Sequence, residues 1–199
     1  MPRKTARPAP PTGAIGPRGY LFTITLRDVR PPVWRRIRVG DVTLDALHAA
    51  IQAAMGWDER HRYFFRIGDA WYGCPGRLDD QSFAAELHDS ATATLGAILA
   101  AGVPRFAYVY DMGDRWEHEV VYEGPTDVAV PTAACLAGAR ACPPEDCGGV
   151  GGFEYLLDVL GDPDHSEHLD LVESLGSYDP DAFDPAWATA RMSRLLKAS

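Results

Sequence analysis

The sequence lacks any apolar run near the roughly 18 residues that a membrane-spanning helix needs. Its first residues, Met1 to Arg7, lead into prolines and not into the apolar core of an export signal. We therefore expect neither membrane insertion nor export, but a reducing, cytoplasmic location. In such a compartment the four cysteines are better interpreted as thiols or metal ligands than as a disulfide framework.

Positive charge is scarce outside the first part of the chain. Residues 1–39 carry nine Arg or Lys against one acidic residue, whereas residues 40–199 carry ten against twenty-seven, and the net charge is −9. This overall acidity argues mildly against nucleic-acid binding. The basic part could still contact phosphate groups through Arg35, Arg36 and Arg38, or these arginines could meet the acidic remainder of the chain.

The composition is otherwise that of a folded protein. Hydrophobic residues make up 46% of the chain and charged residues 24%, and 199 residues is near the usual size of one domain. Residues 1–19 hold five prolines and three glycines with hardly an apolar side chain, so they cannot bury enough surface to offset the entropy of ordering. We predict a flexible, basic, proline-rich tail at 1–19 and a single domain at 20–199.

Alternating apolar residues predict several half-buried strands. The alternation runs over 20–26 and again over 33–39 with prolines between the two, which predicts a hairpin. Thr43 can cap a helix whose apolar residues recur at helical spacing up to Met55, and Gly56 can end it. Further strands are predicted at 63–67, 106–110 and 116–122.

The remaining segments favour helices and loops. The stretch 73–102 is poorly patterned and predicts turns, with room for one short helix near 95–99. Helical spacing predicts three helices near the C-terminus, at 153–160, 169–175 and 187–196. Strands first and helices last indicate an α+β fold, with a mainly antiparallel sheet of about five strands, one helix after the first hairpin and three C-terminal helices.

The strongest chemical feature is a loop at 131–152 that is rich in Pro, Gly and Cys. It carries Cys135, Cys142 and Cys147 within thirteen residues, and thiolates this close repel one another unless a cation neutralises them. Tetrahedral Zn²⁺ is the usual solution, so we predict a structural zinc site here. The spacing lacks the familiar Cys-x2-Cys, and unmetallated buried thiols or a redox role are the alternatives.

A zinc ion held by three thiolates needs a fourth ligand. Period-two alternation places His118 on the apolar face of its strand, where an imidazole needs a partner, so His118 is the first candidate. A hydrogen-bonded core histidine is the competing interpretation. The other candidates for the fourth ligand are His165, His168 and Asp146.

A second group of polar residues could form a pocket over the sheet. It combines imidazoles with carboxylates, which would supply acid and base groups in different environments. However, aspartates beside a glycine turn more often bond local amides, and no nucleophile accompanies the group. The residues of this group are His48, His61, Asp111, Asp114 and Glu117.

Four blocks of sequence stand out in combination. They are YLFTITLRDVRPPVWRRIRV from Tyr20, LHAAIQAAMGW with HRYFFRIGDAWYG within 44–73, FAYVYDMGDRWEHEVVYEG at 106–124 and CLAGARACPPEDCGGVGGFEYLL at 135–157. Together they resemble the Ri-plasmid ORF-3-like family, whose members are also labelled insertion-element passengers or "resolvase-like". The resemblance implies a compact α+β fold and an association with plasmids and mobile elements, but no particular reaction.

The residues do not support recombinase chemistry. A serine recombinase needs an early nucleophilic serine, yet the first serine is Ser82, and a tyrosine recombinase needs a lysine that this chain has only near its ends. We expect a non-enzymatic binding or adaptor module that has a structural zinc loop and recognises a protein or nucleic-acid partner through its basic hairpin. The alternative is a metal-dependent hydrolase or nuclease that uses the His/Asp pocket, with a metal that keeps an open coordination position.

Overall fold

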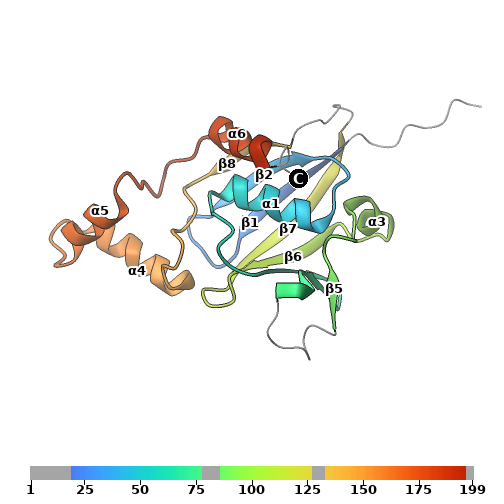
Figure 1. Cartoon of the computed structure of the whole chain (residues 1–199). Coiled ribbons are helices and arrows are strands. Elements are labelled where there is room, and N and C mark those ends of the chain that lie inside the picture. Colours follow the sequence, from blue (N-terminus) through green and yellow to red (C-terminus); the bar gives the residue numbers. More distant parts are fainter. Residues whose placement is uncertain (1–18, 78–85, 127–132, 196–199) are drawn as a thin grey trace, which may run out of the picture.

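The fold is built on one sheet of eight strands, in the order β5-β4-β3-β6-β7-β1-β2-β8 (Figure 1). The structure is a computed structural model, and it describes residues 19–77, 86–126 and 133–195. The strands are β1 (Gly19–Leu26), β2 (Trp34–Val39), β3 (Tyr63–Ile67), β4 (Ala70–Gly73), β5 (Leu87–Asp89), β6 (Arg105–Tyr110), β7 (Trp116–Thr126) and β8 (Ala134–Ala139).

All neighbouring strands pair in antiparallel fashion except β4 and β5, which are parallel and make the sheet mixed. The five strands predicted from alternation are β1, β2, β3, β6 and β7, and they form the continuous centre of the sheet. The predicted hairpin is confirmed, since β1 and β2 pair from Tyr20 with Val39 to Thr25 with Trp34.

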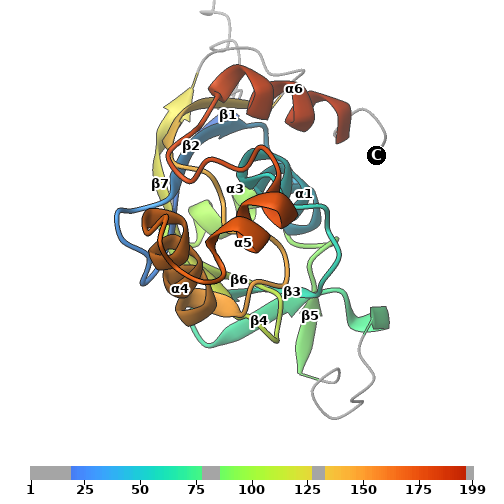
Figure 2. The ribbon, with the colours of Figure 1, turned by 90° about the vertical axis from the view of Figure 1, so that its left-hand side faces the viewer.

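Helix α1 (Leu44–Met55) packs on one face of this sheet. Thr43 caps its first turn by accepting a hydrogen bond from the Ala46 amide, and Gly56 ends it at a φ of 116°, a backbone angle that favours glycine. Its buried side joins the sheet in one core, and the sheet curves around it (Figure 2). The core residues of α1 include Leu44, Leu47, Ala50, Ile51, Ala54 and Met55.

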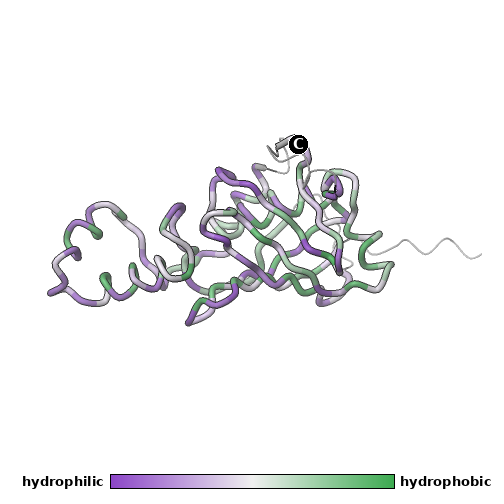
Figure 3. The backbone as a smooth tube through the Cα atoms, turned by 90° about the horizontal axis from the view of Figure 1, so that it is seen from below, coloured by the Kyte–Doolittle hydropathy of each residue, from purple (hydrophilic) through white to green (hydrophobic). Residues whose placement is uncertain are grey.

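The other helices are α3 (Leu95–Ala100), α4 (Gly149–Gly161), α5 (His168–Leu175) and α6 (Pro185–Leu195). Helix α6 packs against α1 and β8, whereas α4 and α5 project beside the sheet (Figures 1 and 2). No residue of α5 is buried, and this projection is mostly purple and white in Figure 3, unlike the greener sheet. None of the helices in the described residues has the length and apolar character needed to cross a membrane.

The predicted arrangement of about five antiparallel strands, one early helix and three late helices is wrong. The described residues hold eight strands in a mixed sheet and five α-helices. Strands β4 and β5 are too short for period-two alternation to mark them, and β8 has the sequence ACLAGA, whose small residues have low strand propensity. Helix α3 lies where a short helix was considered, near 95–99.

The predicted flexible tail at 1–19 falls almost wholly outside the described residues, which begin at Gly19, the first residue of β1.

Candidate binding site

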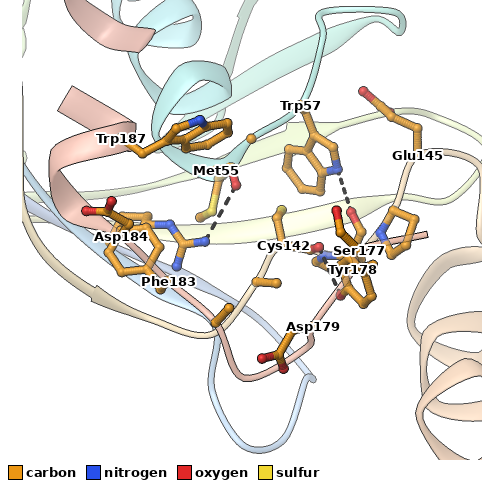
Figure 4. Close-up of a pocket in the computed structure, with 16 residues that line it drawn as sticks. Met55, Trp57, Cys142, Glu145, Ser177, Tyr178, Asp179, Phe183, Asp184 and Trp187 are labelled. Carbon is orange, nitrogen blue, oxygen red and sulfur yellow. Dashed lines mark hydrogen bonds between the residues drawn. The ribbon is translucent and has the colours of Figure 1, made fainter. Parts of the chain in front are cut away.

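A cavity of about 620 Å³ opens between the C-terminal end of α1, the loop after β8 and the segment that leads into α6. Figure 4 shows Trp57 and Trp187 on one side of it and Tyr178 and Phe183 on the other. We call this cavity the aromatic pocket. Its walls are mainly apolar, because Met55, Pro143, Pro144 and Ala182 complete the lining between the aromatic rings.

Two hydrogen bonds fix the loop that forms one wall of the aromatic pocket. Trp57 directly follows the glycine that ends α1, and its indole Nε1 donates to the carbonyl of Pro143 at 3.0 Å. The Tyr178 hydroxyl donates to the carbonyl of Cys142 at 3.1 Å. Both rings therefore hold the 142–143 backbone, while Trp187 remains 50% exposed at the mouth.

Arg35 contributes to the pocket lining although it is only 1% exposed. Its guanidinium donates to the carbonyls of Ala54, Met55, Trp34 and Ala139 at 2.8 to 3.5 Å. The first two carbonyls belong to the last turn of α1, where backbone acceptors lack partners within the helix. The guanidinium also lies 3.9 Å from the centre of the Phe183 ring, so Arg35 connects the helix, the sheet and the pocket wall.

Acidic side chains line the aromatic pocket together with the apolar walls. They are Glu145, Asp179 and Asp184, and both aspartates are exposed. The only cationic side chain in the lining among the described residues is Arg35, whose guanidinium already bonds four backbone carbonyls and lies over the Phe183 ring. The aromatic pocket thus presents an apolar interior with net negative charge toward solvent.

The four cysteines are free thiols at separate places in the fold. Cys135 lies in β8, Cys142 lines the aromatic pocket, Cys147 precedes α4 and Cys74 follows β4. Burial raises the pKa of Cys135 and of Cys142, and burial together with Asp114 raises that of Cys147 to about 12. Within the described residues, their sulfur atoms do not form a group close enough to share one ion.

His118, predicted as the fourth zinc ligand, lies fully buried on the inner face of β7. Its Nδ1 is 3.3 Å from the carbonyl oxygen of Tyr108 on β6, and its ring packs edge-on against Trp57. Burial lowers the pKa of His118 to about 3, so the ring is neutral in the folded protein. Its Nε2 has no hydrogen-bond partner among the described residues.

The second predicted pocket is only partly assembled. His61 and Asp111 come together, with His61 Nε2 and Asp111 Oδ2 3.7 Å apart. A carboxylate oxygen of Asp146 lies within 4.8 Å of both atoms. His48 instead stacks on Tyr63 in the core. The other two predicted residues point elsewhere: Asp114 accepts a hydrogen bond from the Gly148 amide, and Glu117 pairs with Arg27.

The three arginines predicted to contact phosphate differ in accessibility. Arg35 is buried, because it shares the inner face of β2 with Ile37 and Val39. Arg36 faces outward and pairs with Glu123 at 2.7 Å, and Arg38 is half-buried on the same face. The alternation of the sequence already contained this distinction, since it placed Arg36 and Arg38 on one side and Arg35 on the other.

The segment 177–187 is the part of the site that sequence reasoning missed. Its Tyr178, Phe183 and Trp187 stand among aspartates and prolines, and only Trp187 fell within a predicted element, the helix at 187–196. Aromatic residues in such a segment have no helical or strand period, so only their number could have suggested that the segment packs against the rest of the chain.

Three comparisons place the chain among known proteins. Residues 18–187 match the family model described as plasmid pRiA4b ORF-3-like protein. The chain is 38% identical over 178 residues to the uncharacterized protein y4hQ of Sinorhizobium fredii (strain NBRC 101917 / NGR234), covering 88% of this chain and 87% of that protein. It is also similar to the crystal structure of MM3350, a protein of unknown function from Methanosarcina mazei Go1. That similarity has a TM-score of 0.75 and 34% identity and covers 84% of this chain and 96% of the other.

Proposed function

The chain belongs to the plasmid pRiA4b ORF-3-like family, and we propose that it is a non-enzymatic binding module whose aromatic pocket takes up an apolar side chain of a protein partner. The names of its relatives state no reaction, so the proposal rests on the geometry of this chain. The aromatic pocket itself carries it: about 620 Å³ lies within the usual range of ligand cavities, and rigid aromatic walls are common in recognition sites.

Charge complementarity indicates what surrounds the inserted side chain. Glu145, Asp179 and Asp184 line the aromatic pocket, and the chain as a whole carries a net charge of −9. An acidic partner would be repelled from such a surface, and a basic one attracted to it. We therefore propose that the partner presents an aromatic or large aliphatic residue flanked by Lys or Arg.

A displayed library of random peptides tests this proposal with the full chain as bait. Peptides selected on the unaltered protein are then measured against Trp187→Ala, which removes a half-exposed wall of the aromatic pocket. Leu169→Ala is the matched control, because Leu169 is a 78% exposed apolar residue on α5, away from the pocket lining.

The expected result is a set of peptides with an apolar residue beside basic ones, whose affinity drops about tenfold or more with Trp187→Ala and is unchanged with Leu169→Ala. Peptides that bind both variants equally would show that the aromatic pocket is not the recognition site. A selection that yields no binder would contradict the function itself.

The zinc site on Cys135, Cys142 and Cys147 stays a hypothesis of its own. What favours it is that Cys147 lies near enough to contribute to the raised pKa of Cys142 and that His118 Nε2 has no hydrogen-bond partner among the described residues. Against this, the thiols would have to lose protons that burial holds on them. Zinc analysis of the purified protein and of Cys147→Ser tests the site, since loss of a ligand should lower the metal content.

A nucleic-acid partner bound through the hairpin is the other open possibility. Of the three arginines predicted to contact phosphate, only Arg36 and Arg38 have accessible surface, and Arg36 already pairs with Glu123. A retardation assay at low salt with duplex and single strands addresses this possibility, because phosphate contacts weaken steeply as salt is added.

A further inference from the structure

We propose that His61, Asp111 and Asp146 bind one divalent transition-metal ion, at a site separate from both the aromatic pocket and the cysteine thiols. Among the described residues, these three form the only group of potential ligands whose ligand atoms all lie within 4.8 Å of one another. The inference stands independently of the proposed binding function, because it uses none of the aromatic side chains.

The spacing of the ligand atoms fits a single ion. His61 Nε2 lies 3.0 Å from Asp146 Oδ1 and 3.7 Å from Asp111 Oδ2. Metal–ligand distances of about 2.0–2.2 Å place neighbouring ligand atoms about 3.0 Å apart in an octahedral site and about 3.4 Å apart in a tetrahedral one. Glu145 Oε2 lies 3.8 Å from the same nitrogen but is not part of the group whose ligand atoms all lie within 4.8 Å of one another, so water completes the coordination.

The His61 imidazole gives an independent reason to expect a cation. Its Nε2 is buried and has no hydrogen-bond partner among the described residues, and the 3.0 Å approach of Asp146 lacks the geometry of a hydrogen bond. An unbonded polar atom in such a place is costly unless something binds it. Three carboxylate oxygens within 3.8 Å make a positive ion the matching partner.

The carboxylates have only part of their bonding capacity filled. Asp111 is 6% exposed, and its Oδ1 accepts a hydrogen bond from the Gly113 amide, which leaves Oδ2 directed toward His61. The neighbouring Glu145 is held by hydrogen bonds from the Tyr110 hydroxyl and the Asp58 amide. Metal ligands in proteins are commonly held by such outer hydrogen bonds, which fix the ligand oxygen without using it up.

The mixed donor set narrows the choice of ion. Magnesium and calcium prefer oxygen ligands alone, whereas imidazole together with carboxylates suits Zn²⁺ and related first-row ions, and Mn²⁺ also accepts carboxylates and water. The site borders a solvent-facing hollow that is lined by His61 and Asp111 together with Arg60, Arg62, Met112 and Gly113, and water from this hollow can complete the coordination of an ion.

A bound ion would join three segments that are distant in sequence. His61 precedes β3, Asp111 begins the turn between β6 and β7, and Asp146 lies in the loop between β8 and α4. That loop also carries Glu145, which lines the aromatic pocket. The ion would therefore stabilise the wall of the pocket that faces α1.

The test uses the full chain, stripped with a chelator and dialysed, and titrated with ZnCl₂ by calorimetry. A parallel titration with MnCl₂ follows the loss of the free Mn²⁺ signal by electron paramagnetic resonance. The variants are His61→Ala and the milder Asp146→Asn, whose side chain is 63% exposed and whose loss should not unfold the chain. The control is Asp170→Asn on α5, and Cys147→Ser distinguishes this site from one held by the cysteine thiols.

We expect one equivalent of Zn²⁺ or Mn²⁺ to bind and raise the Tm of the unaltered protein, because an ion that binds only the folded state stabilises it. His61→Ala should abolish this binding and Asp146→Asn should weaken it by about tenfold or more. Asp170→Asn should bind both ions as the unaltered protein does, and Cys147→Ser should bind Mn²⁺, which does not favour thiolates, as the unaltered protein does. Three results would overturn the site: no binding of either ion, binding that survives His61→Ala, or binding that Cys147→Ser removes.

Discussion

Arg35 shows how one buried charge can organise a site. A guanidinium with five donors can bond several carbonyls at once, and that of Arg35 bonds carbonyls of α1, β2 and β8 while stacking on Phe183. An uncompensated buried charge would be costly, but here the acceptors at the helix end carry partial negative charge. Arg35 is therefore a structural residue of the aromatic pocket.

Replacing Arg35 with methionine should destabilise the fold by about 3 kcal/mol, because the carbonyls that it bonds would be left buried without donors. Arg36→Met is the matched control on the neighbouring residue of the same strand. Its ion pair with Glu123 is solvent-exposed, so its loss should cost less than about 1 kcal/mol. Urea denaturation measures both, and equal effects would mean that Arg35 does not have the role described.

His118 should make the stability of the protein depend on pH. The pKa of His118 is about 3 in the folded state, against 6.5 for an ordinary histidine such as that of the unfolded chain. Between these two pH values the unfolded chain therefore binds a proton at His118 that the folded chain does not. Stability should then fall as the pH is lowered through this window, by about 1.4 kcal/mol per pH unit from this group. Above pH 6.5 the contribution is constant.

The measurement is urea denaturation between pH 7 and pH 5 for the unaltered protein and for His118→Gln, which cannot titrate in this range. The difference in slope between the two isolates His118 from the other titrating groups. Parallel curves would mean that His118 is protonated in the folded protein or accessible to solvent.

At the scale of elements, β8 and the segment that leads into α6 pack closely at a glycine. A Cβ added at Gly138 would lie 2.5 Å from Cε1 of Phe183 and 2.7 Å from the carbonyl oxygen of Trp34. The backbone oxygen cannot move without disturbing the pairing of β2 with β8. The close approach of Phe183 to β8, and with it one wall of the aromatic pocket, depends on the absence of a side chain at Gly138.

Gly138→Ala should therefore destabilise the protein by about 1–3 kcal/mol through overpacking. Gly151→Ala on α4 is the control, since nothing lies within 4 Å of its added Cβ and alanine favours a helix by about 1 kcal/mol. Thermal unfolding should show opposite shifts of Tm for the two variants. A Gly138→Ala variant as stable as the unaltered protein would show that Phe183 packs there only loosely.

The elements differed in how far the sequence could predict them. Helix α1 was predicted from Thr43 to Gly56 because cap, apolar period and terminating glycine agree. Strand β8 was missed because its burial comes from α6, including a hydrogen bond from its Cys135 amide to the hydroxyl of Thr189, 54 residues later. Its local sequence carries no sign of that partner, and tertiary packing overrides weak propensity there.

The candidate sites were less predictable than the fold for a related reason. Asp111 was singled out beside its glycine turn, and His61 with it, but Asp146 was considered only as an alternative zinc ligand. Its approach to His61 depends on how the loop after β8 lies against the turn between β6 and β7. The family, by contrast, was recognised from the sequence blocks and is confirmed by the match over residues 18–187.

At the scale of the whole molecule, the aromatic pocket is formed where distant segments meet. Its lining residues come from Arg35 and from the segments 55–57, 141–145 and 177–187. Each of these parts is held to another by hydrogen bonds or ring contacts. No single segment contains the site. Binding should therefore be lost on unfolding of the sheet, and isolated peptides of the chain should not reproduce it.

The most direct test of the binding function is fluorine NMR of protein labelled with 5-fluorotryptophan, titrated with a peptide selected on the full chain. Resonances are assigned by replacing single tryptophans with phenylalanine. The account predicts that the signals of Trp57 and Trp187, which line the aromatic pocket, shift along one saturating curve, while those of Trp71 and Trp116 outside it stay in place. Shifts confined to Trp71 or Trp116, or no shift of Trp57 and Trp187 at saturation, would contradict it.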